Sequence, residues 1–459
     1  MQLPPDFISR TRMLLGEEYP RLEDALNVPS PVSIRVNLSK NLRQAGYQRV
    51  PWCDTGYYLP ERLTFTFDPL FHAGAYYVQE ASSMFLEQVI KTYVKGQVKC
   101  LDLCAAPGGK STHLLSVLPE NSLLVSNEVI RSRGHILSEN CTKWGNPYAI
   151  VTRNDPKEIG ALTHFFDVML ADVPCSGEGM FRKDVDSIGE WSVDHVALCA
   201  SRQQRIVHDA WAALKPGGLF IYSTCTYNLE ENEENIHHIA GELGAEVLPV
   251  PVNDSWHVTG ALKYDYPVYR FFPHKTRGEG FFLAVLRKKE EGLFAKNRKQ
   301  RKDKKTTHHP TPRDVFDWIR CSDCFQFETR GDFINAFPAE FFDDYKAIEQ
   351  QLYMVSAGIT MGEVKGKDII PAHSLAMSNL LNQSRFNQLA LSWEEAVKYL
   401  KREAIQLPSV APKGYALTTY KGFPLGFVKQ LGNRANNLYP QEWRIRTGFV
   451  PDVPVLYPL

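Results

Sequence analysis

The run VKCLDLCAAPGGKSTHL, residues 98–114, decides the fold. Its first six residues are mostly apolar and predict a strand over 98–103, and a helix is expected from Lys110. Between them, Pro107, Gly108 and Gly109 lack the side chains that would keep a ligand from the backbone and the helix N-terminus. The spacing is not the GxGxxG of dinucleotide-binding enzymes. The run therefore predicts a cofactor loop of another kind.

The strand–helix alternation continues on the C-terminal side of this loop. A strand is expected at 123–128, a helix from Arg131, and further strands at 149–155, 166–172 and 219–224. A last apolar run, FFLAVL (281–286), is expected to close the sheet. This alternation is typical of an α/β fold whose parallel sheet is covered by helices on both faces.

Acidic residues stand where three of these strands end. Glu128 lies about 20 residues after the loop in the sequence, where an acid can accept hydrogen bonds from ribose hydroxyls. Asp155 and Asp172 end the next two strands. One such acid alone is more often a helix cap or a solvated turn. Three in register predict a ligand crevice at the carboxyl edge of the sheet.

Two cysteines follow the last two of these strands. Cys175 lies in ADVPCSGEGM (171–180) and Cys225 in STCTYNLEEN (223–232). A single cysteine is more often a small buried apolar residue than a nucleophile. If the two strands are neighbours, however, both thiols share one pocket beside the cofactor loop.

At these motifs the sequence resembles the Sun-family RNA 5-methylcytosine methyltransferases, in particular the bacterial RsmF group. The resemblance covers nearly the whole chain and is carried by VNLSK (36–40), AGAYYVQEASS (73–83), LDLCAAPGGKST (101–112), SNEVIRSRGHILSENCTKWG (126–145), ADVPCSGEGMFRK (171–183) and LKPGGLFIYSTCTYNLEENE (214–233). It implies that Cys225 is the nucleophile and that Cys175 promotes product release. It also implies an S-adenosylmethionine site made by Cys104, Ala105, Ala106, Pro107, Gly108, Gly109, Lys110, Glu128, Asp155 and Asp172.

The implied reaction explains why thiols are needed. Carbon 5 of cytosine accepts a methyl group only after a thiolate adds to carbon 6 and turns the ring into an enamine. The adduct must then lose its carbon 5 proton to a base, and a second thiolate would serve. Asp172 would stabilise the adduct at ring nitrogen 3, provided that burial raises its pKa.

The expected architecture is a Rossmann-like S-adenosylmethionine-dependent methyltransferase core with an RNA-binding part on either side. Residues 1–75 form an α+β RNA-recognition appendage, in which the alternating strand PVSIRVNLSK (31–40) exposes Arg35 and Asn37. By resemblance, KDIIPAHSLA (367–376) and KGYALTTYKGFPLGFVKQLGN (413–433) belong to a PUA-like β-rich module. The expected divisions are 1–75, a core at 76–288, a basic linker at 289–312, an intermediate segment at 313–375 and the PUA-like domain at 376–459.

Charge and cysteine usage restrict the other classes. Lys+Arg and Asp+Glu are both 52, so any RNA-binding surface is local, and the ten basic residues of 287–305 are either such a surface or a solvated spacer. The nine cysteines are scattered, and no signal peptide or membrane-length apolar run is seen, which favours the reducing cytoplasm; a monomer is expected. Cys321 and Cys324 form a lone CxxC, so no metal is assigned.

The RNA substrate leaves alternatives open. Small-subunit 16S ribosomal RNA is expected, inside the subunit or its precursor, but a transfer RNA cytosine-5 methyltransferase would show the same motifs. A non-catalytic ribosome-assembly factor would not need both cysteines and the complete loop. An adenine amino-methyltransferase would carry an Asn/Asp-Pro-Pro-Tyr/Phe motif, where this chain has Asp172-Val173-Pro174-Cys175.

Overall fold

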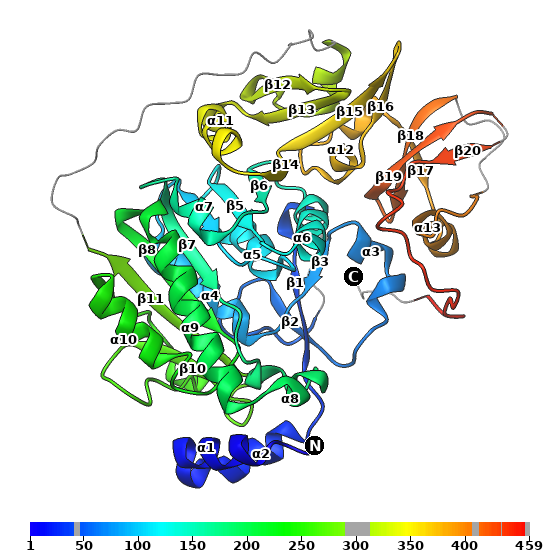
Figure 1. Ribbon diagram of the computed structural model, residues 1–459. Helices are drawn as coiled ribbons and strands as arrows, with labels where there is room; N and C mark the ends of the chain where they lie inside the picture. Colours follow the sequence, from blue (N-terminus) through cyan, green and yellow to red (C-terminus); the bar gives the residue numbers. More distant parts are fainter. Residues whose placement is uncertain (41–45, 290–312, 406–412, 433, 455–459) are drawn as a thin grey trace.

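The structure is a computed structural model that describes residues 1–40, 46–289, 313–405, 413–432 and 434–454. Its centre is a nine-stranded sheet in the order β10-β11-β8-β7-β4-β5-β6-β14, with β9 paired to β11 (Figure 1). The strands are β4 (Lys99–Asp102), β5 (Leu123–Asn127), β6 (Ala149–Thr152), β7 (Phe166–Asp172), β8 (Leu214–Thr224), β9 (Ala245–Val247), β10 (Val268–Phe271), β11 (Phe281–Lys288) and β14 (Met354–Ala357). The five strands from β8 to β6 are parallel, which confirms the α/β prediction.

Neighbouring residues of the inner strands point to opposite faces of the sheet, and both faces are buried. Leu123 and Val125 of β5 pack in one core with helices α7 (Pro156–Gly160), α9 (Val193–Ala210), α10 (Glu233–Glu242) and α11 (Phe342–Gln351). Leu124 packs on the other side with α4 (Leu86–Tyr93) and α5 (Gly109–Val117). Because each strand is covered on both sides, its sequence is a continuous apolar run.

The expectation that residues 281–286 close the sheet is wrong. Strand β11 pairs antiparallel with β8 on one side and with β10 on the other, so β10 is the edge. At the opposite edge, β14 pairs antiparallel with β6, although its residues come from well beyond the core. The C-terminal part thus contributes a strand to the central sheet.

The N-terminal part comprises α1 (Pro5–Leu15), α2 (Tyr19–Leu26) and a small antiparallel sheet in the order β2-β1-β3. Its strands are β1 (Val32–Val36), β2 (Gly56–Leu59) and β3 (Tyr76–Val78). Helix α3 (Pro69–His72) lies between β2 and β3 in the sequence. Strand β3 lies beyond residue 75, so this sheet extends past the expected boundary. The division into domains stays a prediction.

The expectation that Arg35 and Asn37 are exposed is wrong. Arg35 is fully buried, donates to Thr112 Oγ1 at 2.6 Å and stacks on the Trp144 ring with its guanidinium carbon 4.4 Å from the centroid. Asn37 donates to the carbonyls of Gly74 and Trp144. The polar face of β1 turns toward the core helices α5 and α6 (Arg131–Trp144), not toward solvent. The alternation of polar and apolar residues correctly predicted a polar face on β1, but this face contacts protein and not water.

The C-terminal part holds two four-stranded sheets (Figure 1). The first contains β12 (Phe325–Arg330), β13 (Phe333–Pro338), β15 (Ile359–Lys365) and β16 (Asp368–Pro371), with α12 (His373–Met377) following. The second contains β17 (Asn387–Ala390), β18 (Gly414–Tyr420), β19 (Phe423–Gln430) and β20 (Ala435–Asn437), with α13 (Trp393–Leu400). This second sheet shares a core with the N-terminal sheet, and Trp393 Nε1 donates to the Phe67 carbonyl at 2.9 Å.

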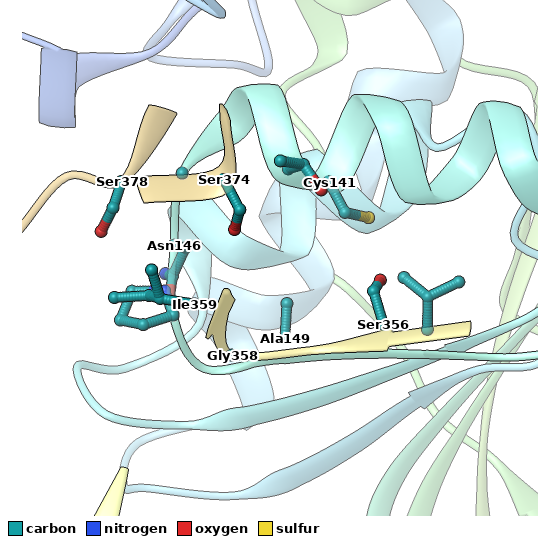
Figure 2. Close-up of a pocket in the computed structure, with 12 residues that line it drawn as sticks. Cys141, Asn146, Ala149, Ser356, Gly358, Ile359, Ser374 and Ser378 are labelled. Carbon is teal, nitrogen blue, oxygen red and sulfur yellow. The ribbon is translucent and has the colours of Figure 1, made fainter. Parts of the chain in front are cut away.

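A small cavity of about 20 Å³ marks the contact between α6, β14 and α12. Figure 2 shows Cys141, Ser356, Ser374 and Ser378 among the residues that line it. A space of this size holds about one water molecule, so it is a packing detail and not a ligand site.

Most of the basic segment lies outside the described residues. Of its ten cations, Arg287 and Lys288 belong to β11, and Lys288 is buried with its Nζ 3.2 Å from the Leu214 carbonyl. Lys288 is therefore part of the fold and not of a linker. Across the described ranges, no helix has the length and apolar content that crossing a bilayer requires.

Candidate active site

The cofactor loop, residues 104–110, connects β4 to α5 as predicted. Gly108 has φ 114°, which favours glycine, and a Cβ there would lie 3.3 Å from Asn140 Cβ. Helix α6 supports the loop, because Arg133 donates to the Ala106 carbonyl and Asn140 to the Pro107 carbonyl, both at 2.8 Å. Hydrogen bonds from α6 thus fix the loop backbone at the N-terminus of α5.

The three predicted acids have different surroundings. Glu128, after β5, is buried, accepts from the Ile130 amide at 2.9 Å and lies 3.6 Å from Arg133 Nη1. Asp172, at the end of β7, is paired with Lys110 Nζ at 2.8 Å. Asp155 is exposed and caps α7 through the Lys157 amide at 3.0 Å. The helix-cap alternative therefore describes Asp155, whereas Glu128 and Asp172 lie at the carboxyl edge beside the loop.

Asp102 is an acid of the same edge that the sequence reading missed. It ends β4, is fully buried and accepts from Ser111 Oγ at 2.6 Å. Its Oδ1 finds no hydrogen-bond partner among the described residues, and burial raises the pKa of Asp102 to about 7. The sequence could have identified Asp102, because it also lies at the carboxyl end of a parallel strand, as the other three acids were expected to.

The two thiols meet, as the neighbouring-strand argument predicted. Strands β7 and β8 pair in parallel with Asp172 opposite Ser223, and the loops that follow bring Cys175 Sγ to 3.0 Å from Cys225 Sγ. The Cys225 amide also points at Cys175 Sγ, at 3.4 Å. Both cysteines are free.

The two thiols have different surroundings. The contact with Cys225, followed by burial, raises the pKa of Cys175 well above the usual value. Either sulfur can donate a hydrogen bond across the 3.0 Å contact. Cys175 is therefore held in its thiol form in the free protein.

Two buried glutamates hold the cysteine loops in place, and the sequence reading did not select them. Glu178 Oε2 accepts from Thr226 Oγ1 at 2.6 Å and from the Tyr227 and Asn228 amides at 2.7 and 2.9 Å. Glu231 accepts from the Ser176 amide at 3.0 Å. Each glutamate thus comes from one cysteine loop and binds the other, so the thiol separation is set by crossed hydrogen bonds.

Lys110 connects the loop to the thiols. Burial lowers its pKa, but Asp172 and then Cys225 favour the charged form more strongly, so the pKa of Lys110 is raised. Its ammonium group also lies 5.1 Å from the Phe281 ring centroid. Lys110 thus places a largely covered positive charge near the Cys225 sulfur.

Comparisons with known proteins agree with this geometry. The family described as "16S rRNA methyltransferase RsmB/F" matches residues 92–287. The N-terminal domain of 16S rRNA methyltransferase RsmF matches residues 3–81, and the methyltransferase RsmF PUA domain matches residues 386–445.

Curated relatives match over most of their length. Ribosomal RNA small subunit methyltransferase F of Aliivibrio fischeri strain MJ11 is 31% identical over 89% of this chain and 90% of its own. The protein of the same name from Aliivibrio salmonicida is 30% identical over 96% and 97%.

Solved structures share the core. A methyltransferase homolog protein from Pyrococcus horikoshii is 28% identical, with a TM-score of 0.51, and covers 62% of this chain and 100% of its own. NSun6 from the same organism, crystallised with SFG, has a TM-score of 0.54 at 21% identity and covers 63% and 99%. With its paired thiols, cofactor loop and three matched regions, the chain belongs to the ribosomal RNA small subunit methyltransferase F family.

Proposed function

We propose that the chain transfers a methyl group from S-adenosylmethionine to carbon 5 of cytidine in 16S ribosomal RNA, through a covalent bond to Cys225 that Cys175 helps to release. The observation that carries this proposal is the pair of free thiols 3.0 Å apart at the carboxyl edge of the sheet. Two thiols in contact suit a reaction in which one adds to a ring and the other removes a proton.

The residues present fit S-adenosylmethionine. The glycines of the loop open the backbone at the start of α5, and Glu128 offers a buried carboxylate at the end of the next strand. Asp102 Oδ1 is a buried acceptor without a partner among the described residues, as expected where a polar ligand group completes the site. Bound there, the cofactor supplies an electrophilic methyl group. The exposed Asp155 stays a proposed contact.

Cys225 is the attacking group in this proposal. Its sulfur lies 3.0 Å from Cys175 Sγ and close to the positive charge of Lys110. A cation near a cysteine assists attack by its sulfur. Addition to carbon 6 of cytosine then raises the electron density at carbon 5.

In this proposal the two thiols act in turn. While Cys225 is free, its contact with Cys175 is the largest cause of the raised pKa of Cys175. Formation of the bond between the Cys225 sulfur and carbon 6 removes that contact. Cys175 would then give its own proton to solvent and, as a thiolate, take the proton from carbon 5, so that the bond to Cys225 breaks.

The role suggested for Asp172 as a buried neutral acid has little support. Its side chain is 34% exposed, and it is bound by Lys110 and by Ser223 Oγ at 2.7 Å. We propose instead that Asp172 accepts hydrogen bonds, from the cofactor or from the amino group of the base, and orients Lys110.

The wider assignments belong to the same proposal. The PUA match and the N-terminal match at either end of the core support RNA binding by both parts. Action on the small ribosomal subunit or its precursor is proposed from the names of the relatives. Location in the reducing cytoplasm is proposed from the free cysteines.

The test uses denaturing gels of enzyme, 16S RNA and S-adenosylmethionine. Cys175→Ala should accumulate a denaturation-resistant protein–RNA species, because it attacks and methylates but cannot release. Cys225→Ala and the double variant should trap nothing and methylate nothing. Cys199→Ala, a buried cysteine of α9, should behave as wild type. Trapping by Cys225→Ala but not by Cys175→Ala would reverse the roles.

A further inference from the structure

Outside the active site, three metal-binding side chains converge in the buried region between the N-terminal part and the core. Cys53, Glu87 of α4 and His113 of α5 are all buried, and one ligand atom from each lies within 4.8 Å of the others. His113 Nε2 is 3.8 Å from Cys53 Sγ and 3.3 Å from Glu87 Oε2. The family matches and the proposed reaction give these residues no role.

We propose that Cys53, Glu87 and His113 form a zinc site that ties the N-terminal part to helices α4 and α5. With ordinary bond lengths, a tetrahedral zinc ion separates its sulfur and nitrogen ligands by about 3.6 Å and its nitrogen and oxygen ligands by about 3.4 Å. The observed separations are 3.8 and 3.3 Å. The donor atoms are therefore already spaced as ligands of one ion.

The orientation of His113 favours an ion over a proton relay. A Cys-His-Glu relay needs both ring nitrogens, one for the thiol and one for the carboxylate. Here both contacts are made by Nε2, and Nδ1 has no partner among the described residues.

The surroundings complete the requirements of such a site. Glu87 Oε1 is held by the Asp54 amide at 3.0 Å and by Lys91 Nζ at 2.6 Å, which fixes Oε2 toward His113. A cleft of about 340 Å³ is lined by Glu87 and Lys91, but not by Cys53 or His113, so a fourth ligand from water would enter on the Glu87 side. Zinc binding replaces the thiol proton of Cys53, so two ligand charges match those of the ion.

The test measures zinc in the full chain. The protein is incubated with ZnCl2, passed through gel filtration and analysed by mass spectrometry of its metal content. A Cys321→Ser/Cys324→Ser background removes the exposed CxxC and should retain one zinc per chain. In that background, Cys53→Ser and His113→Gln should each retain less than a tenth as much.

Two controls distinguish this site from the catalytic thiols. Cys225→Ser and Cys199→Ser should keep the wild-type zinc content. Zinc that survives Cys53→Ser and His113→Gln but disappears in Cys225→Ser would overturn the proposal, since the ion would then occupy the active site.

A measurement on the unaltered ligands covers variants that fail to fold. X-ray absorption of the zinc-loaded background protein should show one sulfur and otherwise nitrogen or oxygen neighbours. A background protein that retains no zinc, or zinc with no sulfur or with two sulfur neighbours, refutes the site.

Discussion

The buried carboxyl of Asp102 makes the stability of the protein depend on pH in a defined way. Its pKa is about 7 in the folded chain against 3.8 for an ordinary aspartate, because burial disfavours the charged form. Below pH 3.8 the group is neutral in both states and has no effect. As pH rises toward 7, the unfolded chain releases the proton and the folded chain keeps it, so stability falls. Each pKa unit corresponds to about 1.4 kcal/mol, which makes the full cost about 4 kcal/mol above pH 7.

Asp102→Asn removes this titration and keeps an acceptor for Ser111. Between pH 5 and pH 8, the free energy of unfolding of the variant should rise relative to wild type by about 3 kcal/mol. Urea denaturation followed by fluorescence, at pH steps across this range, measures the difference. The prediction concerns only how this difference changes with pH. A cost of burying the amide that does not depend on pH is the same at every step and does not affect that change.

The matched control is Asp332→Asn, an exposed aspartate in the turn between β12 and β13. Its curve should run parallel to wild type. Parallel curves for Asp102→Asn as well would refute the argument, since Asp102 would then titrate alike in the folded and unfolded chains.

Three further results are expected. Glu128→Ala should weaken S-adenosylmethionine binding at least tenfold in calorimetry, whereas Asp172→Ala should also slow methyl transfer; unchanged affinity in Glu128→Ala would remove the ribose assignment. Arg35→Met should lower the free energy of unfolding by about 3 kcal/mol, because the buried polar partners of Arg35 lose their donor. The control Arg49→Met, at an exposed arginine, should lower it by less than about 1 kcal/mol. Equal losses would contradict the conclusion that Arg35 holds β1 against the core helices. Neutralising the basic residues of 289–305, with Lys288 left intact, should flatten the salt dependence of RNA affinity, and an unchanged slope would favour the spacer reading.

Much of the site could be predicted from the sequence because its parts are local. The loop at 104–110, Glu128, Asp172 and both cysteines each follow a strand directly, and the ends of parallel strands meet at one edge. Asp102 obeyed the same rule and was missed. The supporting glutamates were not predicted, because a glutamate within a loop gives no periodic signal of its own.

Burial was the property that the sequence predicted least well. Arg35 and Asn37 alternate with apolar residues as exposed side chains do, yet α5 and α6 cover them. Lys288 belongs to a basic run in the sequence, but it is buried at the end of β11 and donates to backbone carbonyls. A row of polar side chains in the sequence indicates that the face does not pack in an apolar core. It does not indicate whether water or polar groups of the protein contact that face.

By itself, the sequence determined the order of strands and helices, the place of the cofactor loop and the presence of two cysteines at strand ends. These follow from hydrophobic periodicity and turn residues over about ten positions. Only the tertiary structure decided that the thiols lie 3.0 Å apart and that Cys53, Glu87 and His113 lie close together. The physical reason is that distance and burial depend on residues separated by tens of positions, which the packing of the sheet brings together.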